Sequence, residues 1–232
     1  MYSIHRLHLA TVHLSGQYNP PSFEDTRISV FGYLVLSDQL AMVVDTGIGV
    51  GNEYIDRTFA PERCSLQEQL GELGLSAKDV TIVVNSHLHF DHCGNNRIFP
   101  NADIVVQERE LRAARSKNYT VNDWYDYEGA RLVPVIGETE IVDGISVLHT
   151  PGHTPGHQSV KVSVKSGQVL IAAQAAFTAD EYQRGGDPEV QAHDGLAEEY
   201  IDSLERLRSV GPCRVLFSHD DTELKQTGGH IT

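Results

Sequence analysis

Short apolar runs of two kinds occur along the first half of the chain. Residues 28–36 (ISVFGYLVL) and 40–45 (LAMVVD) are rich in β-branched and aromatic residues, and the polar residues SDQ separate them. This pattern predicts a β-hairpin. Residues 80–86 (VTIVVNS) and 102–107 (ADIVVQ) are short and have a continuous apolar centre, which is typical of strands buried on both faces. We therefore expect hairpin strands and buried strands in this half.

Three segments have the spacing of helices. In residues 65–75, Ser65 is placed as an N-cap and Glu68 stands at the capping-box position. A second helix is expected over residues 108–116, directly after a buried strand. Residues 196–210 predict an amphipathic helix whose apolar side consists of Leu196, Tyr200, Ile201, Leu204 and Leu207.

The second half of the chain has a period close to two. Short strands are expected in RLVPVI, TEIVDGISVLHT, SVKVSVK, QVLIAAQ and RVLFSHDD. Residues 117–130 (KNYTVNDWYDYEGA) are polar and aromatic without a clear period, so we interpret them as a surface or lid insertion. No Pro/Gly/Ser-rich linker divides the chain. The expected fold class is α/β, with mixed sheets and outer helices in one layered αββα domain over residues 1–232.

The bulk composition narrows the class of protein but not its chemistry. The 232 residues suffice for a full hydrophobic core, and the formal net charge is −14. Such an acidic surface repels phosphate backbones, so no nucleic-acid partner is expected. Cys64, Cys93 and Cys213 form no CxxC pair, which argues against a disulfide framework or a zinc knuckle. No segment has the apolar length of a signal peptide or a membrane span, so we expect a cytoplasmic protein without a membrane partner.

Four side chains of metal-ligand type follow the strand at 80–86 within six residues: His87, His89, Asp91 and His92. Neutral imidazole and carboxylate are the ligands that Zn²⁺ and similar divalent ions take. His87 and His89 point the same way on an extended segment, and a turn after them lets Asp91 and His92 face a neighbouring point. One short loop can therefore serve two metal positions. A polar loop that is His-rich by chance is disfavoured, because the cluster follows a buried strand directly.

Two further histidine segments gain weight beside this cluster. HTPGHTPGH (149–157) places three histidines four residues apart, but its prolines and glycines exclude a helix. We expect a tight loop that can present one histidine inward. His219 stands at the end of a strand in LFSHDD, where sites form in layered α/β sheets. Alone, each would be interpreted as a hydrogen-bonded turn or core histidine.

HLHFDH, TPGHTPGH and FSHD, in this order and spacing, resemble the metallo-β-lactamase superfamily, and VVDTG at 43–47 resembles its early strand–turn motif. Within it, SHLHFDHCGNN, TPGHTPGHQS and FSHD look most like the N-acyl-homoserine lactonases. The resemblance covers residues from Phe31 to Asp220 and implies a four-layer αββα sandwich. It also implies a quorum-quenching hydrolase for a lactone or related ester, in which metal-bound hydroxide attacks the carbonyl. Close relatives act on other esters and lactones, so the substrate stays open.

Carried over position by position, the resemblance implies two metal positions. Their ligands would be His87, His89 and His153 for one, and Asp91, His92 and His219 for the other. One or two zinc ions per chain are expected, with manganese or iron as alternatives. Asp91 would also be catalytic, orienting or deprotonating the attacking water. Asp45 in VVDTG would brace the histidine loop and His157 would support its own loop, neither binding metal, while Cys93 would be a small packed residue.

Two positions depart from the family pattern. In VLIAAQAAFT (169–178), Gln174 stands where the family has an aspartate that bridges the metals. Phe177 stands where lactonases have a tyrosine that contacts the substrate carbonyl. A glutamine is neutral, is one methylene longer and offers one carbonyl oxygen, so we expect the second metal to bind weakly or not at all. A rearranged loop could let Asp180 or Asp187 replace the lost carboxylate. The candidates for the lost hydrogen-bond donor are Tyr33, Tyr119, Tyr125 and Tyr182.

The main expectation is a metal-dependent hydrolase that acts on a small acyl lactone or ester. The alternative is a protein of the same fold with weak or no hydrolase activity, which binds a small acyl ligand or serves a biosynthetic or isomerising step. It follows if Gln174 and Phe177 remove efficient turnover. A nuclease is disfavoured by the acidic charge, an iron oxygenase by Gln174, and a flavodiiron protein by His89. A homo-oligomer is compatible with the sequence.

Overall fold

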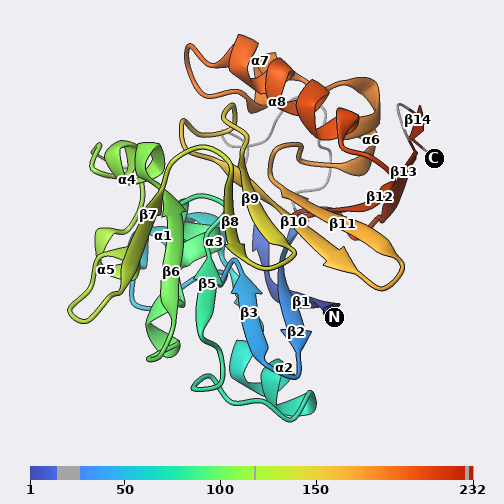
Figure 1. Ribbon diagram of the computed structural model, residues 1–232. Coiled ribbons are helices and arrows are strands. Elements are labelled where there is room, and N and C mark those ends of the chain that lie inside the picture. Colours follow the sequence, from blue (N-terminus) through green and yellow to red (C-terminus); the bar gives the residue numbers. More distant parts are fainter. Residues whose placement is uncertain (15–26, 118, 228–229, 232) are drawn as a thin grey trace.

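The computed structural model describes residues 1–14, 27–117, 119–227 and 230–231. These residues form two seven-stranded sheets that pack between outer helices (Figure 1). The first sheet has the order β4-β1-β2-β3-β5-β6-β7, with β1 Ser3–His13, β2 Arg27–Ser37, β3 Leu40–Val44, β4 Glu62–Arg63, β5 Ile82–Val84, β6 Asp103–Gln107 and β7 Leu132–Val135. The second has the order β14-β13-β12-β11-β10-β9-β8, with β8 Thr139–Val142, β9 Ile145–His149, β10 Gln158–Val164, β11 Gly167–Ala173, β12 Cys213–Phe217, β13 Leu224–Thr227 and β14 His230–Ile231.

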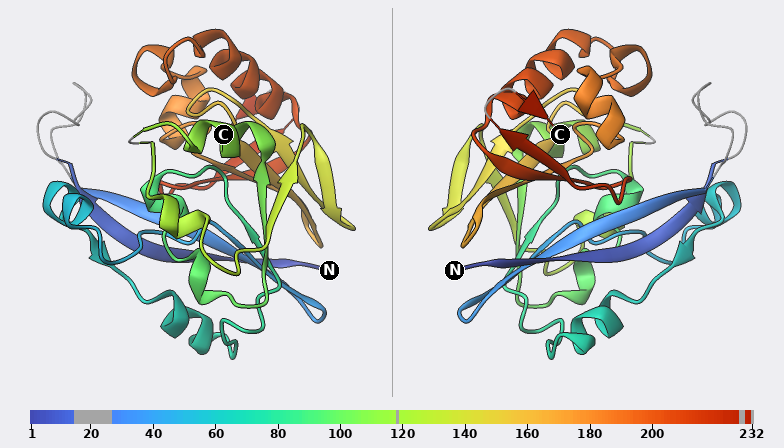
Figure 2. Two further views of the ribbon diagram at one scale, coloured as in Figure 1. Left: turned by 90° about the vertical axis from the view of Figure 1, so that its left-hand side faces the viewer. Right: turned by 90° about the vertical axis from the view of Figure 1, so that its right-hand side faces the viewer.

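The helices divide between the two sheets. Those that follow strands of the first sheet are α1 Glu53–Phe59, α2 Leu66–Glu72, α3 Phe90–Cys93, the 3₁₀ turn η1 Asn96–Ile98, α4 Glu108–Ala114 and α5 Asn122–Tyr125. The second sheet is covered by α6 Ala179–Arg184, α7 Pro188–Gln191 and α8 Ala197–Ser209 (Figures 1 and 2). None of the helices in the described part of the chain combines the length and the apolar character that a bilayer crossing requires.

Three hydrophobic clusters define the four layers. Between the sheets, Val44 of β3 and Ile171 of β11 belong to one cluster. Their neighbours in sequence, Val43 and Leu170, belong to the two outer clusters that lie beneath the helices. This division follows from the pleat, because successive side chains of a strand point to opposite faces of the sheet. The predicted four-layer α/β sandwich is confirmed.

Two local predictions are confirmed in detail. β2 and β3 form the expected antiparallel hairpin, with Ser37 opposite Leu40. At the start of α2, the Ser65 hydroxyl accepts a hydrogen bond from the backbone N–H of Glu68 at 3.2 Å. The helix is shorter than predicted, because Gly74 takes a left-handed φ of +76° and the chain turns away behind it.

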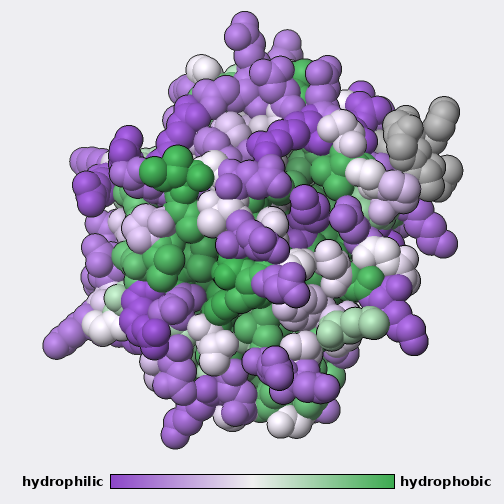
Figure 3. Space-filling model, viewed as in Figure 1, coloured by the Kyte–Doolittle hydropathy of each residue, from purple (hydrophilic) through white to green (hydrophobic). Residues whose placement is uncertain are grey.

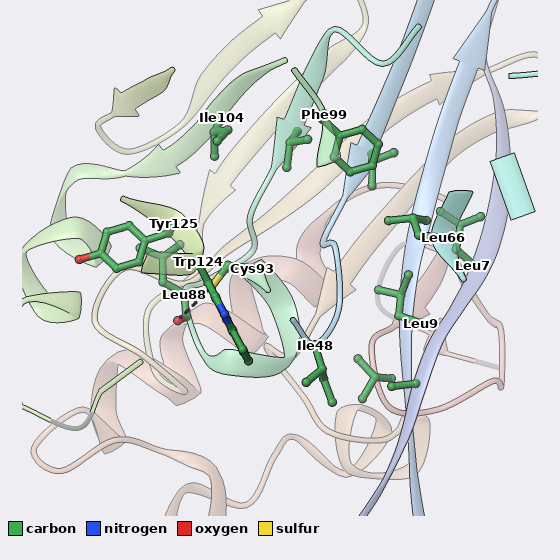
Figure 4. Packing of buried hydrophobic residues seen from close by; sticks show 14 of the residues in the cluster. Leu7, Leu9, Ile48, Leu66, Leu88, Cys93, Phe99, Ile104, Trp124 and Tyr125 are labelled. Carbon is green, nitrogen blue, oxygen red and sulfur yellow. Dashed lines mark hydrogen bonds between the residues drawn. The ribbon is translucent and has the colours of Figure 1, made fainter. Parts of the chain in front are cut away.

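The interpretation of residues 117–130 as a surface or lid insertion is wrong in part. Residues 122–125 form α5, in which Trp124 and Tyr125 are only 9% and 4% exposed. Both residues belong to the first outer cluster, and Trp124 lies beside Cys93 (Figure 4). Trp124 also lies against Gly49, where a Cβ atom would come within 2.6 Å of the indole ring. A four-residue helix is too short to show a hydrophobic period, so its burial was not visible in the sequence.

The carboxyl ends of several strands meet at one edge of the sandwich. β3, β5 and β6 are parallel neighbours in the first sheet, and β11 and β12 are parallel in the second. Two backbone hydrogen bonds join the sheets there, from Gln158 N to Ser86 O at 2.8 Å and from Phe31 N to Ser218 O at 2.7 Å. On the face drawn in Figure 3, hydrophobic residues gather over β6 and β7. Ile136, which directly follows β7, is 77% exposed.

Candidate metal centre

Four strand ends bring the chemically active segments together. The HLHFDH segment follows β5, the 150–157 loop follows β9, Gln174 follows β11 and His219 follows β12. Two residues at strand ends have left-handed backbone without being glycine: Asp45 after β3 (φ 60°) and Ala173 at the end of β11 (φ 54°). Such a conformation costs about 1–2 kcal/mol per residue, so the backbone next to the candidate ligands is locally strained.

One candidate group consists of three histidines. The Nε2 atom of His87 and the Nδ1 atom of His89 are 3.1 Å apart, and the same His89 atom is 3.1 Å from Nε2 of His153. Ligands in tetrahedral geometry at about 2.0 Å from a zinc ion would be about 3.3 Å from one another, so this spacing fits a metal. Burial lowers the pKa of His89 to about 4 and the pKa values of His87 and His153 well below their usual value. All three imidazoles are therefore neutral at neutral pH, as metal ligands must be.

A second group consists of Asp91, His92 and His219, whose ligand atoms lie within 4.8 Å of one another. The Oδ2 atom of Asp91 is 3.4 Å from Nε2 of His92 and 3.6 Å from Nε2 of His219. The Nδ1 atom of His219 donates to the carbonyl of Ser29 at 2.9 Å, while its buried Nε2 has no hydrogen-bond partner. A buried acceptor without a partner is costly, so this nitrogen is suited to a metal.

The charges of the second group differ from those of the first. Burial alone would raise the pKa of Asp91, but His92 and His219 outweigh it and hold that pKa well below its usual value. Burial would lower the pKa of His92, yet the carboxylates of Asp91 and Asp45 raise it to about 10. Without a metal, the group is therefore an ion pair buried at the end of the strands.

Asp45 connects the two groups from behind. Its buried carboxylate accepts from Ser86 N at 2.7 Å, from Ser86 Oγ at 2.8 Å and from His92 Nδ1 at 2.9 Å. The Ser86 hydroxyl is in turn 3.0 Å from Nδ1 of His87. Asp45 thus orients His92 directly and His87 through Ser86. The same hydrogen bonds fix the turn after β5, so the two roles of Asp45 coincide.

Two other residues named from the sequence lie outside both groups. His157 is buried, and its Nδ1 atom is 2.9 Å from the hydroxyl of Thr150 in the same loop. Cys93 is fully buried in the first outer cluster, and its thiol donates to the carbonyls of Leu88 and His89 at 3.5 Å. Burial raises the pKa of this thiol, so it is not a reactive group.

Gln174 and Phe177 both face the candidate centre. Gln174 is 8% exposed, and its Oε1 atom lies 3.1 Å from Nε2 of His92. The Phe177 ring stacks on the ring of His219 at 4.6 Å with an interplanar angle of 17°. Neither Asp180 nor Asp187 takes the place of the aspartate that Gln174 replaces. Both are exposed, and Asp180 pairs with Arg184.

Three of the four candidate tyrosines make their contacts away from the candidate centre. The Tyr33 hydroxyl donates to the carbonyl of Phe217, and that of Tyr182 donates to Gln226. Tyr125 packs in the first outer cluster. Tyr119 alone among these four lines a cavity at the site, although its hydroxyl donates to Glu110.

Two adjoining cavities open over the candidate ligands. The smaller one, of about 210 Å³, is lined by both groups through His89, Asp91, His153 and His219, and by Gln174 and Phe177. The larger one, of about 610 Å³, includes Ile55, Tyr119 and Val121. Phe59, His89 and Phe90 line both cavities, and the two phenylalanine rings stack at 4.5 Å. A ligand with a polar head and an apolar tail would fit this arrangement.

Sequence reasoning missed the backbone and buried groups that orient the histidines. The carbonyl oxygen of Ser29 contacts Nδ1 of His219, and that of Gln191 contacts Nδ1 of His153. Backbone carbonyls cannot be identified as partners from a pattern of side chains. Glu110 on α4 is buried and binds both histidine loops. One signal was available for it: Glu110 lies four residues before the buried Ala114, on the inner side of the helix.

Comparison with known proteins agrees with this geometry. Residues 25–219 match the family model of the metallo-beta-lactamase superfamily. An N-acyl homoserine lactonase of Bacillus sp is 32% identical over 210 residues, which cover 83% of this chain and 82% of that protein. The N-acyl homoserine lactonase AiiB of Agrobacterium fabrum is 28% identical, with 87% and 84% covered. A solved N-acyl homoserine lactone hydrolase, with N-hexanoyl-L-homoserine at its catalytic metal centre, superposes with a TM-score of 0.79 at 25% identity, covering 94% of this chain and 93% of that one.

Proposed function

The chain belongs to the metallo-beta-lactamase superfamily, and we propose on this basis that it is a metal-dependent hydrolase that opens the lactone ring of N-acyl homoserine lactones. Relatives at about 30% identity over most of the chain are lactonases of this kind. The observation that carries the proposal is the convergence of three neutral imidazoles, in which Nδ1 of His89 lies 3.1 Å from Nε2 of both His87 and His153. His89 and His153 line the smaller cavity together with apolar side chains. Ring opening of such lactones is the chemistry of quorum quenching.

His87, His89 and His153 would hold one divalent ion, and Asp91, His92 and His219 would hold a second. Zinc fits a donor set of imidazole nitrogens and one carboxylate, and manganese or iron are alternatives. A bound ion would supply Lewis acidity to the ester carbonyl and lower the pKa of water to about 7.

Asp91 is suited to handle the proton. Its carboxylate is 14% exposed towards the cavity and stays ionised at neutral pH. It can take a proton from the attacking water and return it to the ring oxygen as the C–O bond breaks. Phe177 covers His219 but has no hydrogen-bond donor for the developing oxyanion, which lowers the turnover that this chain can reach.

The cavities suit the two parts of an acyl lactone. The lactone head would occupy the smaller cavity, over the histidines and Gln174. The acyl chain would extend along the stacked Phe59 and Phe90 rings into the larger cavity. Burial of each methylene there contributes about 0.8 kcal/mol, so longer chains should bind more tightly until the cavity is filled.

The two metal positions should differ in affinity. In the absence of metal, His92 is protonated, and its Nε2–H donates to the Gln174 amide oxygen at 3.1 Å. A metal at this position must displace both that proton and the amide, and a neutral glutamine contributes no charge in return. We therefore expect one tightly held ion per chain after zinc reconstitution and desalting. Two retained ions, measured by elemental analysis, would contradict this stoichiometry.

The net charge of −14 supports a small-molecule substrate rather than a nucleic acid. A cytoplasmic location and a homo-oligomeric state stay predictions, to be tested by fractionation and by light scattering.

The test of the proposed function is hydrolysis of N-hexanoyl homoserine lactone before and after chelation. Activity should disappear with the metal and return on addition of zinc, manganese or iron. Activity that survives removal of all metal would reject the proposal. Binding of the lactone without hydrolysis, in the metal-loaded protein, would favour a ligand-binding or isomerising role.

A further inference from the structure

Glu110 is a buried carboxylate that belongs to neither ligand group. It lies on α4, is 0% exposed and accepts four hydrogen bonds. One oxygen accepts from Leu88 N at 2.8 Å and from the hydroxyl of Tyr119. The other accepts from the Thr154 hydroxyl at 2.8 Å and from Gly156 N at 3.0 Å. All its acceptor sites are used, and each donor lies outside α4.

The four donors come from three segments that carry the candidate site. Leu88 lies between His87 and His89, and Thr154 follows His153 directly. Tyr119 lines the larger cavity, and its ring centroid is 5.0 Å from that of His89. A single carboxylate therefore connects both histidine loops with one wall of the cavity.

The loop after His153 is also pressed closely against α4. A Cβ atom on Gly156 would come within 2.1 Å of the backbone nitrogen of Glu110, so no other residue fits there. This close approach brings the N–H of Gly156 within reach of the carboxylate. The distance between the two histidine loops is thus set through Glu110.

Only a carboxylate satisfies this arrangement. A glutamine would offer one oxygen and one NH₂ group, and the NH₂ group would face either Leu88 N or Gly156 N. Both are backbone donors that cannot rotate, so one buried N–H would lose its partner in either orientation. The hydroxyls of Tyr119 and Thr154 can rotate to find another partner, but this does not supply an acceptor for the backbone N–H that lost its own.

We propose that Glu110 is a positioning residue which sets the approach of His89 to His153, so that metal affinity at the three-histidine position depends on its four hydrogen bonds. Through Tyr119 it also links that position to the wall of the larger cavity. This inference rests on the proposed metal site. Loss of a group that orients metal ligands typically weakens metal binding by about 10- to 100-fold, which sets the expected effect.

The experiment is a titration of the metal-free protein with Co²⁺, whose visible absorption reports coordination number and geometry. Wild type, Glu110→Gln, Tyr119→Phe and Tyr182→Phe are compared, and each is first shown to be folded by circular dichroism. Tyr182→Phe is the matched control, because its buried hydroxyl bonds Gln226 and not a histidine loop. The KM and kcat of each zinc-loaded variant for N-hexanoyl homoserine lactone are measured in parallel.

Glu110→Gln should weaken Co²⁺ binding by about 10- to 100-fold and change the absorption spectrum. Tyr119→Phe should have a smaller effect on affinity and a larger effect on KM than on kcat, while Tyr182→Phe should lower only the melting temperature. If Glu110→Gln melts earlier but keeps wild-type affinity and spectrum, the inference is overturned. If it does not fold, an unchanged affinity, spectrum and KM in Tyr119→Phe overturns it instead. Wild type that binds no Co²⁺ rejects the metal site itself, whereas wild type that binds Co²⁺ but leaves lactones intact rejects only the proposed reaction.

Discussion

The two ligand groups lie at the same edge of the sandwich and share the segment after β5, but they are built differently. The group of His87, His89 and His153 consists of three neutral imidazoles whose loops are joined by Glu110. The group around Asp91 contains a carboxylate and a protonated histidine, and a second carboxylate, Asp45, contacts that histidine from behind. In the absence of metal, one group is a set of neutral imidazoles in contact with one another, and the other is a buried ion pair.

Ligand identity alone therefore does not determine how readily a metal position is filled. Both groups have three residues of the right type, yet the second must break an ion pair and move the Gln174 amide before it can bind. The first consists of neutral imidazoles, so no ion pair has to break within it before a metal binds. What each histidine does in the metal-free protein therefore sets the order in which the positions fill.

The sharpest test of the comparison removes one ligand from each group. His87→Ala should lower kcat/KM for N-hexanoyl homoserine lactone by about 1,000-fold or more, because a metal supplies several kcal/mol of transition-state stabilisation. His219→Ala should cost only about tenfold, because the three-histidine position would still be filled. Steady-state kinetics and metal content are measured on both variants. Equal losses in the two would mean that the positions are not independent.

The pH dependence of the metal-free protein should differ between the groups. Folding lowers the pKa values of His87, His89, His153, His157 and His219, so the unfolded chain binds more protons below pH 6.5. Stability should therefore fall from pH 6.5 towards pH 5, by up to about 1.4 kcal/mol per pH unit for each such histidine. The pKa of His92 is raised to about 10, so its contribution is complete below pH 6.5 and is lost as the pH rises through 10.

Urea denaturation of the chelated protein at a series of pH values measures both arms of this profile. His219→Gln is the control for the acidic arm and should make it shallower by one histidine. A free energy of unfolding that stays constant from pH 6.5 to pH 5 would show that these histidines are not neutral in the folded chain.

Gln174→Asp should make the two groups more alike. The new carboxylate would face His92 and supply the charge that a second ion needs, raising affinity at the Asp91 position by about 10- to 100-fold. Gln174→Asn is the matched control, since it has the same length as aspartate but no charge. Both metal content and lactone hydrolysis are measured. A large rise in hydrolysis for the aspartate alone would mean that the natural residue limits turnover, and equal metal contents would contradict a role for charge.

Phe177→Tyr should produce the smallest change. A hydroxyl near the His219 ring could donate to the developing oxyanion and raise kcat by about threefold, well below what an ideally placed donor provides. The KM should change little, because the stacked ring stays in place. A lower kcat at unchanged stability would mean that the hydroxyl obstructs the lactone.

Local patterns determined much of this protein. The two β-rich runs at 28–36 and 40–45 predicted a hairpin, Ser65 and Glu68 predicted a helix start, and both are confirmed. The HLHFDH segment predicted candidate ligands, because six consecutive residues necessarily lie close together in space. That these residues bind metal stays a prediction. The 117–130 segment was misjudged because the burial of Trp124 depends on a partner, Gly49, that is remote in the chain.

The grouping and orientation of the candidate ligands depend on how the two sheets pack, which no local pattern in the sequence predicts. His153 reaches His89, and His219 reaches Asp91, because β9 and β12 of the second sheet end beside β5 of the first. The residues behind them, Glu110, Asp45 and the Ser29 carbonyl, act at separations of up to 190 residues. Periodicity and capping are properties of neighbours in sequence, so they can be read from the chain. The closure of two sheets against each other depends on every layer at once, and it is this closure that determines which lone pairs converge.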